Sequence, residues 1–148
     1  LCLVAFAQTA TGLVKDKTGE PMIGVVTFDL NNLKMCNDNY GHSSGDAYII
    51  HSAHIIETTF DRFGKCYRIG GDEFCCLIPD AAEFQIERFI QKMQQDIAIL
   101  NNKNIIPTEV GIACGYALAT PDDADIEKVR ERADEMMYHN KKVLKGLI

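Results

Sequence analysis

Acidic residues stand at the ends of two apolar runs, where a folded sheet would hold them rigidly. Asp29 closes a continuous, β-branched run, and Asp72 and Glu73 follow a Gly-Gly pair that separates two shorter runs. Hard carboxylate oxygens bind Mg²⁺, which proteins commonly share with substrate phosphates. The sequence therefore predicts metal-assisted phosphate chemistry at these three acids. A turn with ordinary solvated acids is the alternative that so short a motif leaves open.

The Gly-Gly pair predicts a tight hairpin. The apolar runs at 66–69 and 74–78 are each short enough to be a strand. Glycine readily adopts the positive φ that tight hairpin turns need, and it lets a ligand approach the backbone closely. We therefore expect positive φ at Gly70 and Gly71, with the two acids at the foot of the returning strand.

Hydrophobic periodicity predicts the other elements. Strand-like runs occupy 23–28 and 110–118, and helices are expected over 1–16, from about 43, over 82–101 and from about 122. Ser43 and Asp46 have the spacing of a capping box, and Asp122 and Asp123 are acids that favour a helix start. The order helix, strand, helix, strand, strand, helix, strand, helix predicts an α/β (α+β) fold, with one mixed sheet flanked by helices.

Length and charge limit the function. The 148 residues suffice for one domain spanning 1–148, and no apolar run reaches the roughly 20 residues of a membrane span. We therefore expect no direct membrane contact. A net charge of −6 argues against nucleic acid as a partner, and it means that a polyanionic substrate would need cations to hold it. The apolar start without an initiator Met is interpreted as the cut end of a longer chain.

The six cysteines are interpreted as small buried hydrophobic residues in a reducing cytoplasm rather than as disulfides. They include no C-x-x-C pair, and the histidines do not fall at zinc-finger spacing. Cys75 and Cys76 are neighbours in an expected strand, so their side chains should point to opposite faces.

Three stretches together resemble the GGDEF family of diguanylate cyclase domains. The first is the string Gly70 to Phe74. The second follows the family pattern D-x-D-x-F-K-x-x-N-D-x-x-G-H-x-x-G-D, with these residues in register: Asp29, Lys34, Asn37, Asp38, Gly41, His42, Gly45 and Asp46. The third, Ala133 to Lys141, is similar to the closing helix A-D-x-A-M/L-Y-x-A-K. The resemblance covers nearly the whole chain and implies a fold related to nucleotide cyclases and polymerase palm domains. The opening D-x-L-T-G-L-x-N-R segment is missing before Leu1.

The resemblance implies metal ligands. Asp29, the backbone carbonyl of Leu30 and Asp72 match positions that hold two metal ions, Mg²⁺ or alternatively Mn²⁺. Glu73 matches a position that assists metal binding or catalysis, and the division of roles between Asp72 and Glu73 stays open.

It also implies contacts to GTP. Asn37 and Asp46 match the residues that read guanine, whose edge suits an amide and a carboxylate. Lys34 and Lys141 match lysines that contact the triphosphate, and Lys34 is expected to take part in catalysis with Asp72 and Glu73. The other GTP contacts that we expect are Leu33, Gly70, Gly71 and Lys145.

Some departures from the family pattern bear on the metal site and on product inhibition. Asn31 replaces the second acid of D-x-D, and Leu33 replaces the usual Phe. The R-x-x-D motif of product-inhibited members would fall at 61–64, where Asp61 and Gly64 stand instead. We therefore expect no tight inhibitory binding of cyclic di-GMP at that position.

The resemblance implies condensation of two GTP molecules into cyclic di-GMP by a Mg²⁺-dependent homodimer, with release of two pyrophosphates. It also implies a cytoplasmic location and an N-terminal sensor domain in the longer protein. The main alternative is an inactive domain that binds GTP and regulates a partner, and the intact Gly70 to Phe74 argues against it. A second alternative is synthesis of a mixed cyclic GMP-AMP, against which the intact Asp46 argues.

Overall fold

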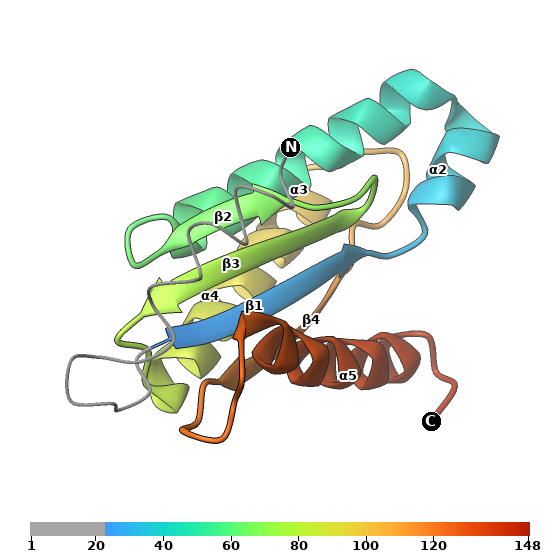
Figure 1. Ribbon diagram of the computed structural model, residues 1–148. Coiled ribbons are helices and arrows are strands. Elements are labelled where there is room, and N and C mark those ends of the chain that lie inside the picture. The colour runs from blue at the N-terminus through green and yellow to red at the C-terminus, as the bar shows by residue number, and fades with distance from the viewer. Residues whose placement is uncertain (1–22) are drawn as a thin grey trace.

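One sheet with strand order β2-β3-β1-β4 forms the centre of the computed structural model, which describes residues 23–148 (Figure 1). The expected helix over 1–16 lies outside the described residues. The elements follow in the order β1 (Ile23–Leu30), α2 (Leu33–Tyr40), α3 (His42–Phe60), β2 (Lys65–Arg68), β3 (Glu73–Pro79), α4 (Glu83–Asn102), β4 (Ile112–Leu118) and α5 (Ile126–Leu144).

Helices cover both faces of the sheet, so β1 is buried at every position. Val26 and Phe28 belong to the core cluster beneath α3 and α4, whereas Ile23 and Val25 pack with residues of α5. Because side chains alternate along a strand, Asp29 falls on the same face as Val25. The sheet therefore presents Asp29 toward α5, which Figure 1 shows on the face opposite α3 and α4.

The predicted fold class is confirmed, with two differences in the sheet. All three strand pairings among the described residues are antiparallel, where a mixed sheet was expected. In addition, Gly70 and Gly71 do not have positive φ. The connection between β2 and β3 spans residues 69–72 and closes by hydrogen bonds from the backbone N–H groups of Ile69 and Gly70 to the carbonyl of Glu73 (2.9 and 3.3 Å). This longer loop removes the need for a strained two-residue turn.

One predicted cap and one predicted helix start are wrong. The capping box at Ser43 and Asp46 does not form, because α3 begins at His42 with Gly41 (φ 88°) as its N-cap and no side-chain cap. The separate short helix α2 was not anticipated. The last helix begins at Ile126, and its N-cap is Asp125, whose side chain accepts from the Lys128 N–H.

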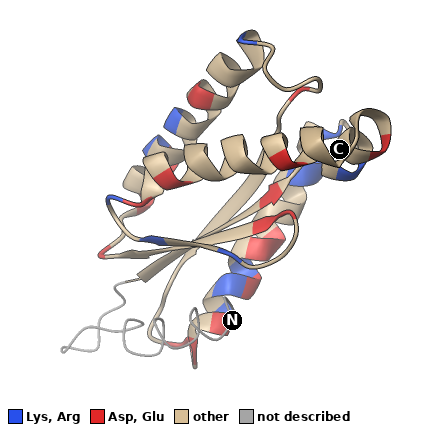
Figure 2. Cartoon of the chain, turned by 90° about the horizontal axis from the view of Figure 1, so that it is seen from above, with Lys and Arg blue, Asp and Glu red and all other residues tan. Residues whose placement is uncertain are grey.

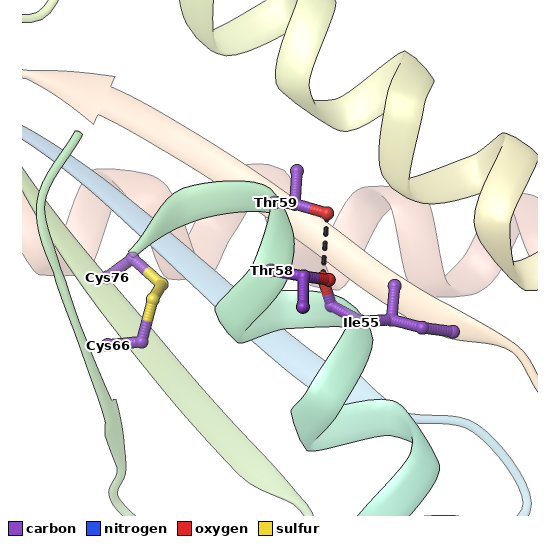
Figure 3. Close-up of a disulfide and its surroundings, with 5 residues drawn as sticks. All are labelled: Ile55, Thr58, Thr59, Cys66 and Cys76. Carbon is purple, nitrogen blue, oxygen red and sulfur yellow. Dashed lines mark hydrogen bonds between the residues drawn. A yellow bond between two sulfur atoms is a disulfide. The ribbon is translucent and has the colours of Figure 1, made fainter. Parts of the chain in front are cut away.

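The interpretation of the cysteines is wrong for one pair. Cys66 and Cys76 face each other across β2 and β3, with Cα atoms 4.2 Å apart, and form a disulfide beside α3 (Figure 3). Cys36, Cys75 and Cys114 are free and buried, as expected. The pairing depends on the register of two strands, which spacing along the chain does not reveal.

Asp123 is used in an ion pair with the partly exposed Arg132 rather than at a helix start. Its side chain is 5% exposed and accepts from Arg132 Nη2 (2.8 Å) and from the Thr120 N–H (2.7 Å). The hydrogen bond from Arg132 lowers the pKa of Asp123 to about 2. The carboxylate therefore ties the loop before α5 to the body of that helix.

We expect Asp123→Asn to destabilise the fold by about 2 kcal/mol near neutral pH, the free-energy equivalent of a pKa lowered from 3.8 to about 2. A lowered pKa stabilises the fold above the ordinary value, and that stabilisation is lost as the pH falls toward 2. Urea unfolding should show the gap between wild type and variant narrowing from about pH 6 to pH 3. The exposed neighbour provides the control, Asp122→Asn. A gap that stays constant with pH would assign the effect to packing instead.

Within residues 23–148, no helix combines the length and the apolar character that crossing a membrane requires. Acidic and basic segments are interleaved along the helices (Figure 2). Binding of a charged ligand therefore depends on local groups of charged side chains rather than on one large charged face.

Candidate active site

A cleft of about 440 Å³ opens where β1, the β2–β3 loop, α2 and the end of α5 meet. Five residues predicted for the site line it: Leu30, Lys34, Asp72, Lys141 and Lys145. Asn32, Met35, Asp38 and Asn39 complete the lining. Three lysines and two acids, Asp38 and Asp72, form an environment that suits a metal-bound polyphosphate.

The three predicted acids lie together beside this cleft. One oxygen from each of Asp29, Asp72 and Glu73 lies within 4.8 Å of the others. Asp29 and Glu73 are paired across β1 and β3, and the Leu30 N–H donates to the Asp72 carbonyl (2.8 Å). The sheet register therefore brings together acids that are 43 residues apart in the chain.

Lys141 supplies a positive charge at this cluster. Its Nζ lies 2.9 Å from Asp29 Oδ1, and the two side chains are 23% and 10% exposed. Asp29 is one of the three clustered carboxylates, so the Lys141 ammonium lies beside the cluster. An ammonium group at this point shows that the cluster attracts and accommodates a cation.

Glu73 is in an electrostatically strained position. Partial burial and the neighbouring carboxylates of Asp29, Asp72 and Asp134 raise its pKa. Glu73 lines a second hollow, of about 220 Å³, with Asp134 of α5, whereas Asp72 lines the lysine-rich cleft. The two acids of the hairpin thus border different spaces.

The donor set fits a hard divalent cation. Three carboxylates and the nearby carbonyl of Leu30 offer oxygen ligands, which Mg²⁺ prefers and shares with phosphates. Burial and the neighbouring carboxylates together raise the pKa of Glu73, and such a cation would relieve the repulsion among the carboxylates.

Arg68 fastens the loop that carries the acids. Its Nε donates to the Gly70 carbonyl (3.2 Å) and its Nη2 to the Gly71 carbonyl (2.7 Å). A Cβ on Gly70 would lie 3.2 Å from Glu73 Oε2, whereas Gly71 has open space around it. Gly70 therefore leaves room for the Glu73 carboxylate, a packing reason rather than the conformational one predicted.

The two predicted guanine readers lie where α2 packs against the first turns of α3. Asn37 is half-buried, and Asp46 is exposed. A Cβ on Gly45 would collide with Asn37 Oδ1, so the amide of Asn37 lies against the residue that precedes Asp46. Neither residue lines the 440 Å³ cleft. Leu33, another predicted contact, is buried in the core, and Gly70 and Gly71 also lie outside that lining.

Tyr48 is a site-organising residue that the sequence did not reveal. Its buried hydroxyl donates to the Asn31 carbonyl (2.6 Å) and accepts from the Gly111 N–H (2.9 Å). Burial raises the pKa of Tyr48 to about 12, so the hydroxyl remains a donor. Asn32 then turns the chain from β1 into α2 with φ 60°, a conformation that Asn tolerates. The hydrogen-bond partners of Tyr48 lie 17 and 63 residues away in the chain, and no local pattern could have identified them.

Comparison with known proteins agrees with this geometry. The family described as "Diguanylate cyclase, GGDEF domain" matches residues 4–145. Diguanylate cyclase DgcN of Escherichia coli is 29% identical over 139 residues, which cover 93% of this chain and 34% of DgcN. This chain thus spans about a third of the length of that relative.

Solved structures share the fold. The GGDEF domain of PA1120 from Pseudomonas aeruginosa has a TM-score of 0.77 and 21% identity, covering 94% of this chain and 88% of that one. The GGDEF domain of DgcB from Caulobacter crescentus, in complex with c-di-GMP, has a TM-score of 0.74 and 21% identity, covering 95% and 78%. With the family match over nearly its whole length, the chain belongs to the GGDEF domain family of diguanylate cyclases.

Proposed function

We propose that this domain condenses two GTP molecules into cyclic di-GMP. One observation carries the proposal: the carboxylates of Asp29, Asp72 and Glu73 meet beside a cleft lined by Lys34, Lys141 and Lys145. In each of two steps, a ribose 3′-oxygen of one nucleotide bonds to the α-phosphorus of the other. The bond between the α-phosphorus and the bridging oxygen breaks, pyrophosphate leaves, and the hydroxyl proton passes to solvent.

The chain's own residues would divide the work. Asp29, the Leu30 carbonyl and Asp72 would hold Mg²⁺, or Mn²⁺ in its place, and Glu73 would complete the ligand set. The bound ion would supply charge neutralisation at the phosphates and acidify the 3′-hydroxyl. Lys34 and Lys141 would stabilise the charge that builds up on the leaving pyrophosphate, and Lys145 would add attraction at the rim.

One cleft of this size holds one nucleotide, so each domain supplies half of the reaction centre. The proposal therefore includes a homodimer during turnover, with the cleft of one protomer facing that of its partner. A domain that uses GTP would work in the cytoplasm, and control of pairing would fall to a sensor domain elsewhere in the full-length protein.

The direct test is incubation of the purified protein with GTP and Mg²⁺, followed by mass analysis of the products. The proposal requires cyclic di-GMP and two pyrophosphates for each molecule of product. Bound but unreacted GTP would support the regulatory alternative instead. Omission of the metal, with excess chelator, provides the control and should abolish turnover.

We expect binding to favour GTP over ATP by at least about tenfold, because adenine would leave the Asn37 and Asp46 groups unpaired, at roughly 1–3 kcal/mol for each unpaired group. Calorimetric titration of both nucleotides measures this ratio. Asp46→Asn should reduce it, since the carboxylate can no longer accept two N–H groups from guanine. Asp61→Asn, at the opposite end of α3, is the matched control. Equal affinity for the two nucleotides in the wild type would remove Asn37 and Asp46 from base recognition.

A further inference from the structure

The outer edge of β4 is occupied by side chains of α5. In the described sheet, β4 pairs only with β1. The backbone N–H and C=O groups of every second β4 residue therefore point away from β1. Three α5 side chains each bind one of these groups: Asn140 Oδ1 accepts from the Cys114 N–H (3.1 Å), Met136 Sδ from the Tyr116 N–H (3.4 Å), and Arg132 Nη2 donates to the Leu118 carbonyl (3.0 Å).

These contacts share a matched repeat. The α5 residues are four apart, about 6.0 Å along a helix, and their β4 partners are two apart, about 6.8 Å along a strand. Residue numbers rise along α5 as they fall along β4. Sliding or rotating α5 by one residue would therefore break all three contacts together. The stripe of Arg132, Met136 and Asn140 sets the register of α5 on the sheet.

The contact between Asn140 and Cys114 adjoins the active site. Lys141, the residue after Asn140, is paired with Asp29 (2.9 Å). Ala113, the residue before Cys114, is the β4 partner of Asp29 in the sheet. The contacts Asn140–Cys114 and Lys141–Asp29 are thus neighbours on both elements. A shift of the last turns of α5 would move Lys141 away from Asp29.

We propose that Asn140 is a positioning residue for Lys141. By holding the Cys114 N–H, its amide oxygen fixes the end of α5 so that the Lys141 ammonium meets the Asp29 carboxylate. On the proposed function, on which this second part rests, the same placement aligns Lys141 with the triphosphate of GTP. Asn140 itself touches neither the acids nor the substrate.

The first test does not depend on GTP. Trace acetylation with acetic anhydride, read by mass spectrometry, compares the reactivity of Lys141 with that of exposed Lys145 in the same molecule. Lys141 should react more slowly in the wild type, and Asn140→Leu should speed its reaction about three- to tenfold, the equilibrium value of one hydrogen bond. His139→Leu, at an exposed neighbouring position, is the control. Unchanged Lys141 reactivity in folded Asn140→Leu would overturn the proposal.

A conservative variant separates positioning from folding. Asn140→Asp keeps an oxygen acceptor at the same place and should leave Lys141 slow to react. Should Asn140→Leu fail to fold, Asn140→Ser replaces it, because the serine oxygen is one bond nearer the backbone and falls short of the position from which Asn140 Oδ1 accepts from the Cys114 N–H. Amide exchange at Cys114 should rise in that variant and not in Asn140→Asp. Equal Lys141 reactivity in the Ser and Asp variants would contradict the role.

The second test measures GTP affinity in a double-mutant cycle. Asn140→Leu should weaken GTP binding about three- to tenfold in the wild type and less than about twofold in the Lys141→Met background. Equal losses in both backgrounds would show a general structural role and overturn the proposal. A wild type that binds no GTP would instead refute the proposed function, and the acetylation result would still decide the role of Asn140.

Discussion

Replacement of Asp29 or Asp72 by asparagine is expected to lower GTP turnover about a thousandfold or more. Each change keeps the shape of the side chain but removes a charge from the three-carboxylate cluster. Loss of a ligand to the proposed Mg²⁺ forfeits several kcal/mol of transition-state stabilisation. Steady-state assays of pyrophosphate release measure the effect, and circular dichroism verifies the fold.

A control variant separates the effect of losing a charge at the site from the effect of changing the net charge. Asp122→Asn removes the same charge from an exposed turn and should leave turnover unchanged. Direct titration with Mn²⁺, followed by electron paramagnetic resonance, should show weaker binding in both site variants. Near-normal turnover in either one would exclude that carboxylate from the metal site.

Gly115→Ala is expected to destabilise the fold by about 3 kcal/mol, at the upper end of the usual cost of overpacking. The Cβ of Ala would collide with the backbone N of Met137 and the carbonyl oxygen of Ala133, so the whole of α5 would have to move. Urea unfolding measures the loss. GTP affinity should fall as well, because Lys141 is carried by the same helix.

Another glycine provides the matched control for that experiment. Gly71 has nothing within 4 Å of a built Cβ and does not have positive φ. Gly71→Ala should therefore change the free energy of unfolding by less than about 0.5 kcal/mol. Similar destabilisation at both positions would mean that α5 yields readily, which contradicts a tightly seated helix.

The sequence predicted the parts of the site that depend on local pattern. Asp29 ends an apolar run, Asp72 and Glu73 follow a turn, and the structure brings all three within 4.8 Å of one another. Lys34 and Lys141 were expected near the phosphates, and both line the cleft. Such residues could be found because their neighbours in the chain form a fixed-spacing motif.

Features that depend on distant partners were missed. The disulfide between Cys66 and Cys76 requires the β2–β3 register, and Tyr48 finds its partners only after β1 and β4 are adjacent. Asn140 occupies a position where the closing-helix motif has alanine, so motif matching passes over it. The predicted cap at Ser43 failed because Gly41 ends α2 and begins α3 within one residue, which leaves no room for a capped start.

The stripe on α5 also limits how molecules of this protein can associate. A strand edge with unpaired N–H and C=O groups invites another chain to add a strand. At β4, side chains of α5 already bind the Cys114 N–H, the Tyr116 N–H and the Leu118 carbonyl, so a strand added there would have to break these three contacts. Among the described strands, the other edge is β2, which is only four residues long. We therefore expect two copies to associate through side-chain surfaces rather than through a continuous intermolecular sheet along β4.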